Sequence, residues 1–318
     1  MDDMMLPPVL SAAVNEFVQW TTQQLVAEQE ATKITQPLYH YTNAPGLRGI
    51  VESQKVRLTG YPYLNDPSEL IYGMGIVHKL LKEISEETHD GLVDMFCQIV
   101  NNVFQHENFS DTFGFYIASF SRARNDLGQW RAYADNGRGF ALGLAPHLFM
   151  AVENPNPQPT EYVVMPVVYG RENAERRYRV AIKAAAAVVQ ANRPHLEDKI
   201  VGIPFLRVMA NQLISGQLIA ISLATKHEAY SHEQEVRLVM IGTCDHQKSY
   251  INTRVRGSEI VPFIEGDMPL RDKNGIFEIV VGPAAALSAK DAVRSLLQSF
   301  GIELGDRIYA SDIPYRAV

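Results

Sequence analysis

Three charged residues, Glu233, Glu235 and Arg237, stand at the entrance to an apolar stretch. Apart from Arg237, residues 236–241 are β-branched or apolar, which predicts a central strand buried on both faces. Strand side chains alternate in direction, so a spacing of two places all three charged groups on one face. Such carboxylates can stabilise positive charge on a substrate and orient a nucleophile. The alternative is an internal ion pair of Arg237 with Glu233 or Glu235 that only fixes the strand, since unpaired buried charge is costly.

The elements predicted around this strand indicate an α+β fold. Apolar residues at helical spacing predict helices over residues 8–32, 70–84 and 92–103, and over most of residues 171–224. Strand patterns occur at residues 38–42, 56–59, 113–120, 140–144, 162–169, 236–241, 250–255, 260–264 and 277–281. Because the strands are clustered, we expect a mixed or largely antiparallel sheet flanked by helices. Residues 1–36 are expected to form an N-terminal packing helix, and residues 37–318 a single catalytic-type α+β domain with a helical insertion at about 171–224.

The composition is that of an ordinary soluble globular protein. Of 318 residues, 46% are hydrophobic and 20% are charged, and the net charge is -7. The 29 Lys and Arg residues form no basic stripe, which disfavours nonspecific nucleic-acid binding. Cys97 and Cys244 lack zinc-site spacing, so we expect no metal and a reducing compartment. Without a signal-peptide pattern or an apolar run of about 20 residues, the chain is expected to be cytoplasmic and not in a membrane.

Several short motifs resemble catalytic signatures without matching them. Gly137, Gly139 and Gly143 form GxGxxxG, which is one residue too long for a dinucleotide fingerprint and follows a predicted helix. His227 and His232 have a spacing that does not place two zinc ligands on one helix face. Neither GxSxG nor the P-loop pattern occurs. Hydrolase triads, zincins and P-loop enzymes are therefore disfavoured.

Seven motifs, in order along the chain, resemble a bacterial family of domains of unknown function, numbered twenty-nine seventy-one. The resemblance runs from Leu38 to the C-terminus. The motifs are Leu38-Tyr-His-Tyr-Thr42, Leu64-Asn-Asp-Pro-Ser-Glu69, Ser119-Phe-Ser121, Trp130-x-x-Tyr133-Ala-Asp-Asn136 with Gly139, Glu233-x-Glu235-x-Arg237, Val280-Val-Gly-Pro283 and Ser311-Asp-Ile-Pro-Tyr-Arg316. The chain departs from the family just before ExExR, where Tyr230-Ser-His232 stands in place of a frequent Trp or Phe. Membership of this family does not by itself imply an activity.

The order of three motifs is also similar to that in ADP-ribosyltransferases. Those enzymes place a His on the first strand, a Ser or Tyr on a middle strand and a Glu at the start of a late strand. Here the matching segments are His40-Tyr41-Thr42, Ser119-Phe-Ser121 and Glu233-Gln-Glu235. The resemblance implies a split sheet and transfer of ADP-ribose from NAD, as substrate, to a macromolecular acceptor (protein or nucleic acid), in a toxin or phage-defence effector. Two alternatives stay open: a noncatalytic module that senses a nucleotide or protein, and a hydrolase of NAD or another nucleotide.

This second resemblance also implies roles for individual residues. Breaking the nicotinamide–ribose bond develops an oxocarbenium-like charge, which Glu235 would stabilise. Glu233 would orient or deprotonate the acceptor, unless it only pairs with Arg237. His40 would bind a ribose hydroxyl, and Thr42 would help to hold the nicotinamide end. Replacing Glu235 by Gln is expected to abolish turnover and to change stability by less than about 1 kcal/mol.

The remaining candidates each have a structural alternative. Tyr41 belongs to the NAD-binding motif, and Tyr63 would either stack on the nicotinamide ring or pack in the protein. Ser119 and Ser121 would brace the glutamates or be ordinary strand-edge serines. The other candidates are the loop-fixing Asn65, the helix cap Asp66, and the packing residues Trp130 and Tyr133. Arg138 and Arg48 would contact the pyrophosphate, unless Arg48 only belongs to the solvated surface.

Overall fold

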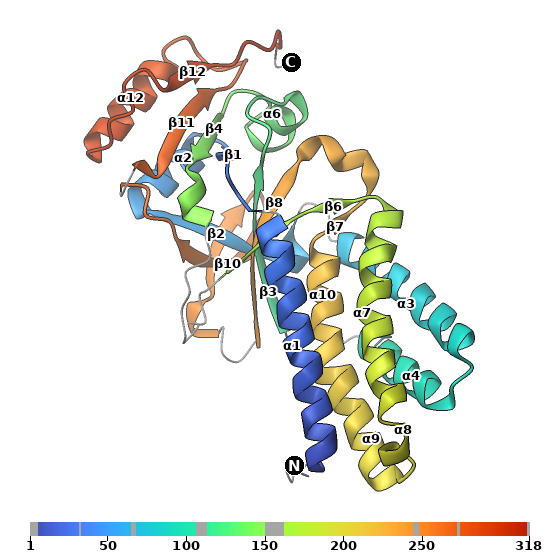
Figure 1. Ribbon diagram of the computed structural model, residues 1–318. Coiled ribbons are helices and arrows are strands. Elements are labelled where there is room, and N and C mark those ends of the chain that lie inside the picture. Colours follow the sequence, from blue (N-terminus) through green and yellow to red (C-terminus); the bar gives the residue numbers. More distant parts are fainter. Residues whose placement is uncertain are drawn as a thin grey trace. The chain divides into compact units, whose positions relative to one another are not determined.

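The computed structural model describes residues 6–31, 33–64, 68–105, 113–149, 162–243, 248–271 and 274–316. Contacts divide the chain into a helical unit and a sheet unit (Figure 1). The helical unit comprises Met1–Thr32, Asp66–Asp111 and Val168–Glu228, and the sheet unit comprises Lys33–Asn65, Thr112–Val167 and Ala229–Val318. In the described ranges, no helix combines the length and the apolar character needed to cross a membrane.

The helical unit is built from helices that pack around a shared apolar core. They are α1 (Pro8–Ala31), α3 (Ser68–Thr88), α4 (Gly91–Gln105), α7 (Arg171–Ala191), α8 (Arg193–Leu196), α9 (Lys199–Arg207), the π-helical η3 (Val208–Ile214) and α10 (Ser215–Leu223). In α3, Val77, Leu80 and Ile84 recur at helical spacing and are buried on one face. α7 contributes small buried residues such as Ala181 and Ala185 to the same core. Because these side chains are short, neighbouring helices pack closely against α7.

In the described residues, the sheet unit contains one ten-stranded sheet, which is mixed but mainly antiparallel. Its strands are β1 (Leu38–Thr42), β2 (Lys55–Gly60), β3 (Phe113–Ser121), β4 (Phe140–Leu144), β5 (Val163–Pro166), β8 (Glu235–Thr243), β9 (Asn252–Arg256), β10 (Glu259–Asp267), β11 (Ile276–Val281) and β12 (Ile308–Ala310). Its helices are α2 (Ala44–Ser53), α6 (Leu127–Tyr133) and α12 (Ala289–Ser299). The predicted α+β class, with a mainly antiparallel mixed sheet, is therefore confirmed.

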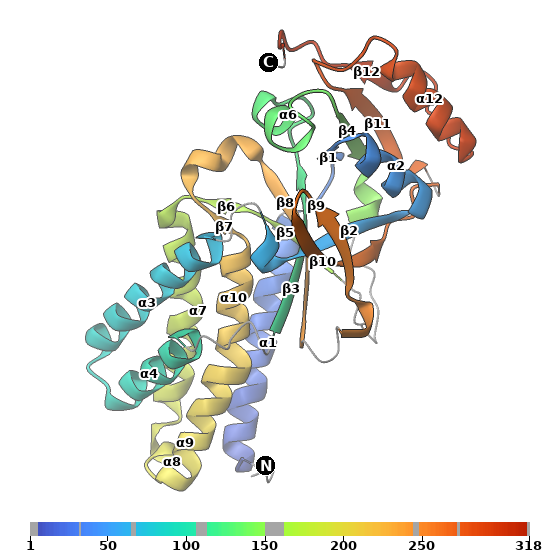
Figure 2. The same ribbon diagram turned by 180° about the vertical axis from the view of Figure 1, so that it is seen from behind.

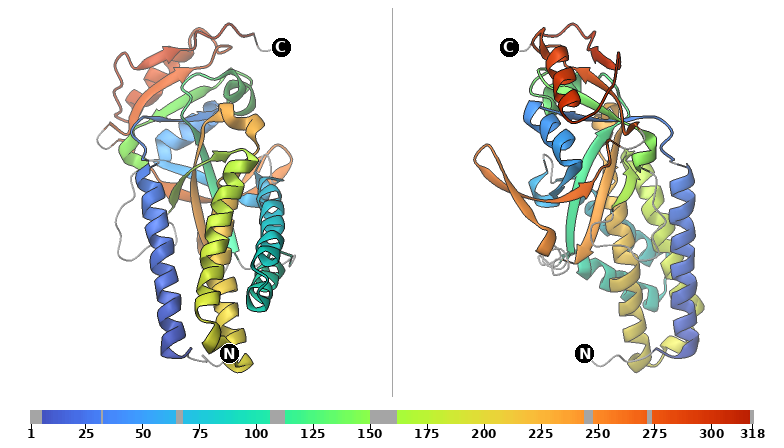
Figure 3. Two further views of the ribbon diagram at one scale, coloured as in Figure 1. Left: turned by 45° about the vertical axis from the view of Figure 1, so that its right-hand side comes forward. Right: turned by 90° about the vertical axis from the view of Figure 1, so that its left-hand side faces the viewer.

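The order along the sheet is β12-β11-β4-β1-β3-β2-β10-β9, and β8 pairs with both β3 and β5. Only β11 and β12 pair in parallel among the paired strands of this sheet in the described ranges. Figures 1 and 2 show β3 and β8 side by side, and Figure 3 shows β9 and β10 as a hairpin that curves away from them. One face of the sheet packs Phe120, Leu142 and Leu238 into the core, together with Val293 and Leu297 of α12.

The sheet is split at β3. β8 pairs with β3 along its whole length and so occupies one edge of it. On the other edge, β2 pairs at Tyr116 and Ile117, whereas β1 pairs at Ser121. The strand edge between Ile117 and Ser121 is therefore where β1 and β2 diverge, and α2 connects the two strands. Asn43 begins α2 by accepting a hydrogen bond from the main chain of Gly46 at 2.9 Å.

Two predicted strands differ from the observed ones. The strand predicted at residues 162–169 is two strands, because β5 joins the large sheet whereas β6 (Val168–Tyr169) pairs in parallel with β7 (Thr225–Lys226) of the helical unit. The strand predicted to be buried up to Ile241 is buried from Val236 to Met240, and Ile241 is 43% exposed. The apolar run alone does not show where the neighbouring strand β5 ends.

Candidate active site

An imidazole lies in the split between β1 and β2. The Nδ1 atom of His40 lies 3.0 Å from the main-chain oxygen of Ser119, and its ring contacts that of Phe120 at a centroid distance of 5.4 Å. A carbonyl oxygen only accepts, so Nδ1–H is the donor, and Nε2 of the neutral ring is an acceptor. Burial lowers the pKa of His40, the bond to Ser119 opposes this, and the charge of Arg254 lowers the pKa further. Through Nε2, a neutral His40 can therefore accept a hydrogen bond from a hydroxyl group.

Glu235 and Arg237 form a buried two-point ion pair at the start of β8. The Nε atom of Arg237 donates to Oε1 of Glu235 at 2.8 Å, and an Nη atom donates to Oε2 at 3.0 Å. The two side chains are only 7% and 3% exposed. Their opposite neighbours on β3 are Ser121 and Ser119, respectively. The internal ion pair that the sequence left open is thus formed with Glu235, and it holds the carboxylate in one orientation.

The strand on which the spacing argument depends does not extend to Glu233. Gln234 has a φ of 45°, in the left-handed region, which interrupts the alternation of side chains. Glu233 consequently ends the 3-10 turn η4 (Glu228–Glu233), and β8 begins only at Glu235. Its main-chain oxygen accepts a hydrogen bond from Ser121 Oγ at 2.6 Å, and its buried carboxylate lies 3.5 Å from the hydroxyl of Tyr133. The two carboxylates therefore come from different elements.

The other residues of the β1 motif contact protein. Thr42 is buried, and a side chain at Gly46 would clash with its hydroxyl, so α2 covers it closely. The hydroxyl of Tyr41 donates to the main-chain oxygen of Ala123 at 2.9 Å, and its ring meets Trp130 edge to face at 4.8 Å. Trp130 is fully buried. Tyr41 and Trp130 thus form a packed cluster, while the assigned role of Tyr41 in binding NAD stays a prediction.

Four candidates are exposed on the sheet unit. Tyr63, in the 3-10 turn η1 (Tyr61–Tyr63), is 39% exposed, and Ser119 and Arg138 are also exposed. Arg48 is exposed and forms an ion pair with Glu52 on the same helix at 3.5 Å. Ser121, in contrast, is buried and binds the main chain of Glu233. Asn65 and Asp66, including the predicted helix cap, lie outside the described residues.

Sequence reasoning missed a cluster of arginines beside His40. Arg254 of β9 donates to Thr59 Oγ1 of β2 at 3.0 Å, and it lies 6.0 Å from the ring centre of Phe263. Arg57 stacks over the same ring at 4.7 Å. Burial lowers the pKa of Arg254, and so do the charges of Arg57 and Arg256. The alternation of Arg254 and Arg256 in the sequence was the available signal, but it is also typical of an exposed hairpin.

A second buried carboxylate lies on β11. Glu278 accepts hydrogen bonds from the hydroxyl of Tyr39 at 2.8 Å and from Nε of Arg124 at 2.5 Å. Arg124 also lies 4.8 Å from the ring centre of Tyr309. Burial raises the pKa of Tyr39, and the bond to Glu278 raises it further. The Tyr39 hydroxyl consequently stays protonated and serves as a hydrogen-bond donor.

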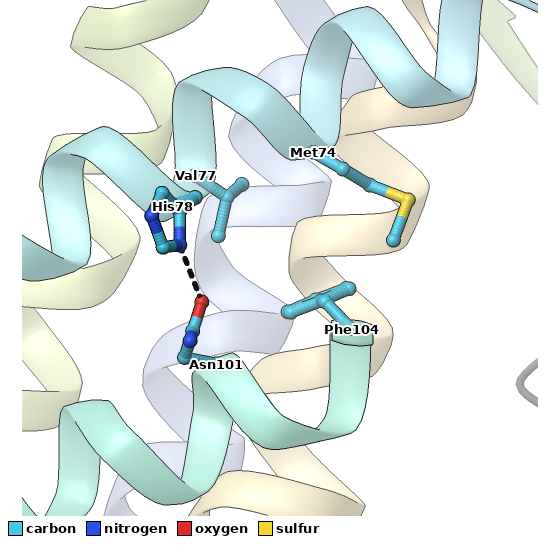
Figure 4. A pocket seen from close by; sticks show the side chains of 5 residues that line it. All are labelled: Met74, Val77, His78, Asn101 and Phe104. Atoms are coloured by element: carbon cyan, nitrogen blue, oxygen red, sulfur yellow. Dashed lines mark hydrogen bonds between the residues drawn. The ribbon is translucent and has the colours of Figure 1, made fainter. Parts of the chain in front are cut away.

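A recess of about 280 Å³ lies in the helical unit (Figure 4). Its lining residues are Met74, Val77 and His78 of α3 and Asn101 and Phe104 of α4. His78 Nδ1 donates to Asn101 Oδ1 at 2.7 Å. The recess thus contains one closed polar pair and apolar side chains. No group of three or more potential metal ligands occurs among the described residues, and burial raises the pKa of the Cys97 thiol to about 12.

Comparison with known proteins gives one family. Residues 129–238 match the family described as "Protein of unknown function (DUF2971)". This segment includes Trp130, Tyr133 and the Glu233-x-Glu235-x-Arg237 motif. No curated protein and no solved structure matches the chain significantly. The motifs before residue 129 and after residue 238 lie outside the match. The resemblance to the family in those parts of the chain therefore stays a prediction. The family prediction is confirmed for residues 129–238, which match the model of the family of proteins of unknown function DUF2971.

Proposed function

We propose that the sheet unit binds NAD at the split between β1 and β2 and transfers ADP-ribose to a macromolecular acceptor. One observation carries this proposal. The register pairs Tyr39 with Ser121 and Ser121 with Glu235, so the three motif segments lie on adjacent strands at one end of the sheet. These segments are remote in sequence, and their order is the one that ADP-ribosyltransferases use.

In the proposed reaction, the bond between the ribose C1′ atom and the nicotinamide nitrogen breaks, and nicotinamide leaves with the bonding electrons. Positive charge then develops on the ribose, and the oriented carboxylate of Glu235 stabilises it. A carboxylate offers about four acceptor sites, so its pair with Arg237 is compatible with a bond to a ribose hydroxyl. The acceptor nucleophile forms the new bond to C1′, and Glu233 takes its proton.

His40 supports binding of the ribose in this proposal. Its Nδ1–H is held by the main chain of Ser119, so the acceptor atom Nε2 is the one that would receive a ribose hydroxyl. The lowered pKa favours this neutral form at physiological pH. His40 therefore acts as a positioning residue, and its replacement should raise KM more than it lowers kcat.

One observation favours a second candidate function, a noncatalytic nucleotide-binding module. The carboxylate of Glu235 is engaged by Arg237 at two points and is 7% exposed. In such a module the pair would only fix the strand. A hydrolase of NAD is the third candidate, in which water replaces the macromolecular acceptor.

The deciding experiment measures release of labelled nicotinamide from NAD by the full-length protein, with Glu259→Gln as a control for an exposed carboxylate. We expect release with the native protein and the control, and none with Glu233→Gln. Binding of NAD without release would contradict both catalytic functions and support the module. ADP-ribose label retained on a macromolecule supports transfer, whereas free ADP-ribose as the only product supports hydrolysis. Sensitivity of the label to protease or nuclease then identifies the acceptor class.

A further inference from the structure

The antiparallel register brings the cationic side chains of β2 and β9 to one face of the sheet. Thr59 is opposite Phe263, and Arg254 of β9 is opposite Val261, two residues before Phe263 on β10. Arg57 is two residues before Thr59 on β2. Because the side chains of opposite residues share a face, Arg57, Arg254, Thr59 and Phe263 all point to the same side.

The guanidinium of Arg254 is held in place but only partly satisfied. Thr59 Oγ1 accepts one hydrogen bond from it at 3.0 Å, and the Phe263 ring lies beneath it. Its Nε atom is buried and has no hydrogen-bond partner in the structure. A buried N–H group without a partner is costly, so a native site normally provides an acceptor for it.

The neighbouring carboxylates are already engaged by other cations. Glu265 pairs with Lys55 at 3.1 Å, and Glu259 pairs with Arg256 at 3.0 Å. Within the described ranges, no carboxylate forms an ion pair with Arg57 or Arg254. Two guanidiniums on one aromatic ring therefore lack a protein anion, and they repel each other.

We infer that Arg57 and Arg254, held on Phe263, form a phosphate-binding site beside His40 that takes the pyrophosphate of a nucleotide. The Nε and Nη atoms of a guanidinium form a fork that matches two phosphate oxygens. The two cations of the cluster suit a short phosphate group. The net charge of -7 on the whole chain disfavours a long polyanion as the ligand. As the site of the NAD pyrophosphate, this inference rests on the proposed function.

The test compares the affinity of the full-length protein for ADP and for adenosine by calorimetry. The two ligands share the base and the ribose and differ only in the phosphates. We expect ADP to bind at least about tenfold more tightly, because a charge-assisted hydrogen bond contributes roughly a factor of ten or more. The preference should weaken as salt concentration rises.

Three variants locate the site. Arg254→Gln and the exposed Arg57→Gln should each weaken ADP binding about tenfold and leave adenosine binding unchanged. Arg256→Gln, on the same strand but paired with Glu259, is the matched control and should stay within about twofold. Equal affinity of the native protein for ADP and adenosine would overturn the inference, and so would unchanged ADP affinity in folded Arg57→Gln and Arg254→Gln.

This experiment separates the inference from the proposed function. ADP binding through Arg57 and Arg254 without nicotinamide release leaves the phosphate site in place and contradicts the transferase. Nicotinamide release with an unchanged KM for NAD in both arginine variants would contradict the phosphate site and not the transferase. In that case the reaction stands and the pyrophosphate is bound elsewhere.

Discussion

Two glutamates of the sheet unit are buried beside an arginine, and the two pairs are built differently. Glu235 and Arg237 are two residues apart on one strand, and both are less than a tenth exposed. Glu278 is 7% exposed, but its partner Arg124 is 43% exposed and is distant in sequence. Glu278 also accepts a hydrogen bond from Tyr39 at 2.8 Å. The second carboxylate thus joins three remote segments, whereas the first joins neighbours.

A contact between remote segments restrains the fold, so the network around Glu278 has a structural explanation. Burying both charges of an ion pair costs free energy that their attraction often does not offset. Under the proposed function, the pair with Arg237 would orient the Glu235 carboxylate next to the split.

The largest effect should come from breaking the Glu235–Arg237 pair. Glu235→Gln and Arg237→Met should each lower the free energy of unfolding by about 3–5 kcal/mol, since each breaks a buried two-point ion pair. The bidentate geometry therefore revises the sequence-based expectation of a change below about 1 kcal/mol for Glu235→Gln. Urea unfolding, followed by tryptophan fluorescence, measures the loss.

The double variant Glu235→Gln/Arg237→Met is the control for that prediction. Removing both charges should restore most of the stability lost in either single variant, because the two charges of the pair are removed together. A double variant as unstable as the sum of the two single variants would show that the two side chains are not coupled. Once folded, it should still release no nicotinamide if Glu235 acts on the substrate.

A smaller loss is expected at the second pair. Glu278→Gln should lower the free energy of unfolding by about 1–2 kcal/mol, because the half-exposed Arg124 is left in contact with water. The amide can still accept a hydrogen bond from Tyr39. The same urea titration checks this value. A loss as large as that of Arg237→Met would contradict the distinction between the two pairs.

Local sequence patterns were sufficient to predict parts of the site. The β-branched run after Glu235 predicts a strand, and the spacing of Glu235 and Arg237 predicts two groups on one face, as observed. The strand was predicted too far at Glu233, because the left-handed backbone of Gln234 leaves no clear mark in the sequence. A Gly or Asn at that position would have indicated it.

Contacts between distant strands could not be predicted. The sequence does not give the register of β2 with β10 or of β10 with β9, and only that register places Arg254 beside Thr59 and Phe263. The partners of Glu278 depend likewise on the pairing of β11 with β4 and of β4 with β1. Strand order is a property of the whole sheet, whereas the patterns used here extend over a few residues.

The imidazole in the split should give a smaller, pH-dependent effect. The pKa of His40 is lowered on folding, so the unfolded chain binds the proton more readily. The stability associated with the neutral ring is complete above about pH 6.5 and is lost as the pH falls towards the pKa of the folded state. His40→Gln cannot titrate, so its stability deficit relative to the native protein should shrink between about pH 7.5 and pH 5. Urea titrations at both pH values measure this change, and a constant deficit would contradict it.

The smallest effect is expected at the exposed pair of Arg48 and Glu52, which are 69% and 56% exposed. Arg48→Gln should change the free energy of unfolding by no more than about 0.5 kcal/mol, because water and salt screen such a pair on a helix surface. The Arg48→Gln variant also distinguishes between two residues that could bind the pyrophosphate. Arg48 already has a carboxylate partner, whereas Arg254 has a buried Nε atom without one. ADP affinity measured by calorimetry should therefore be unchanged in Arg48→Gln, and a tenfold loss would move the phosphate site from β9 to α2.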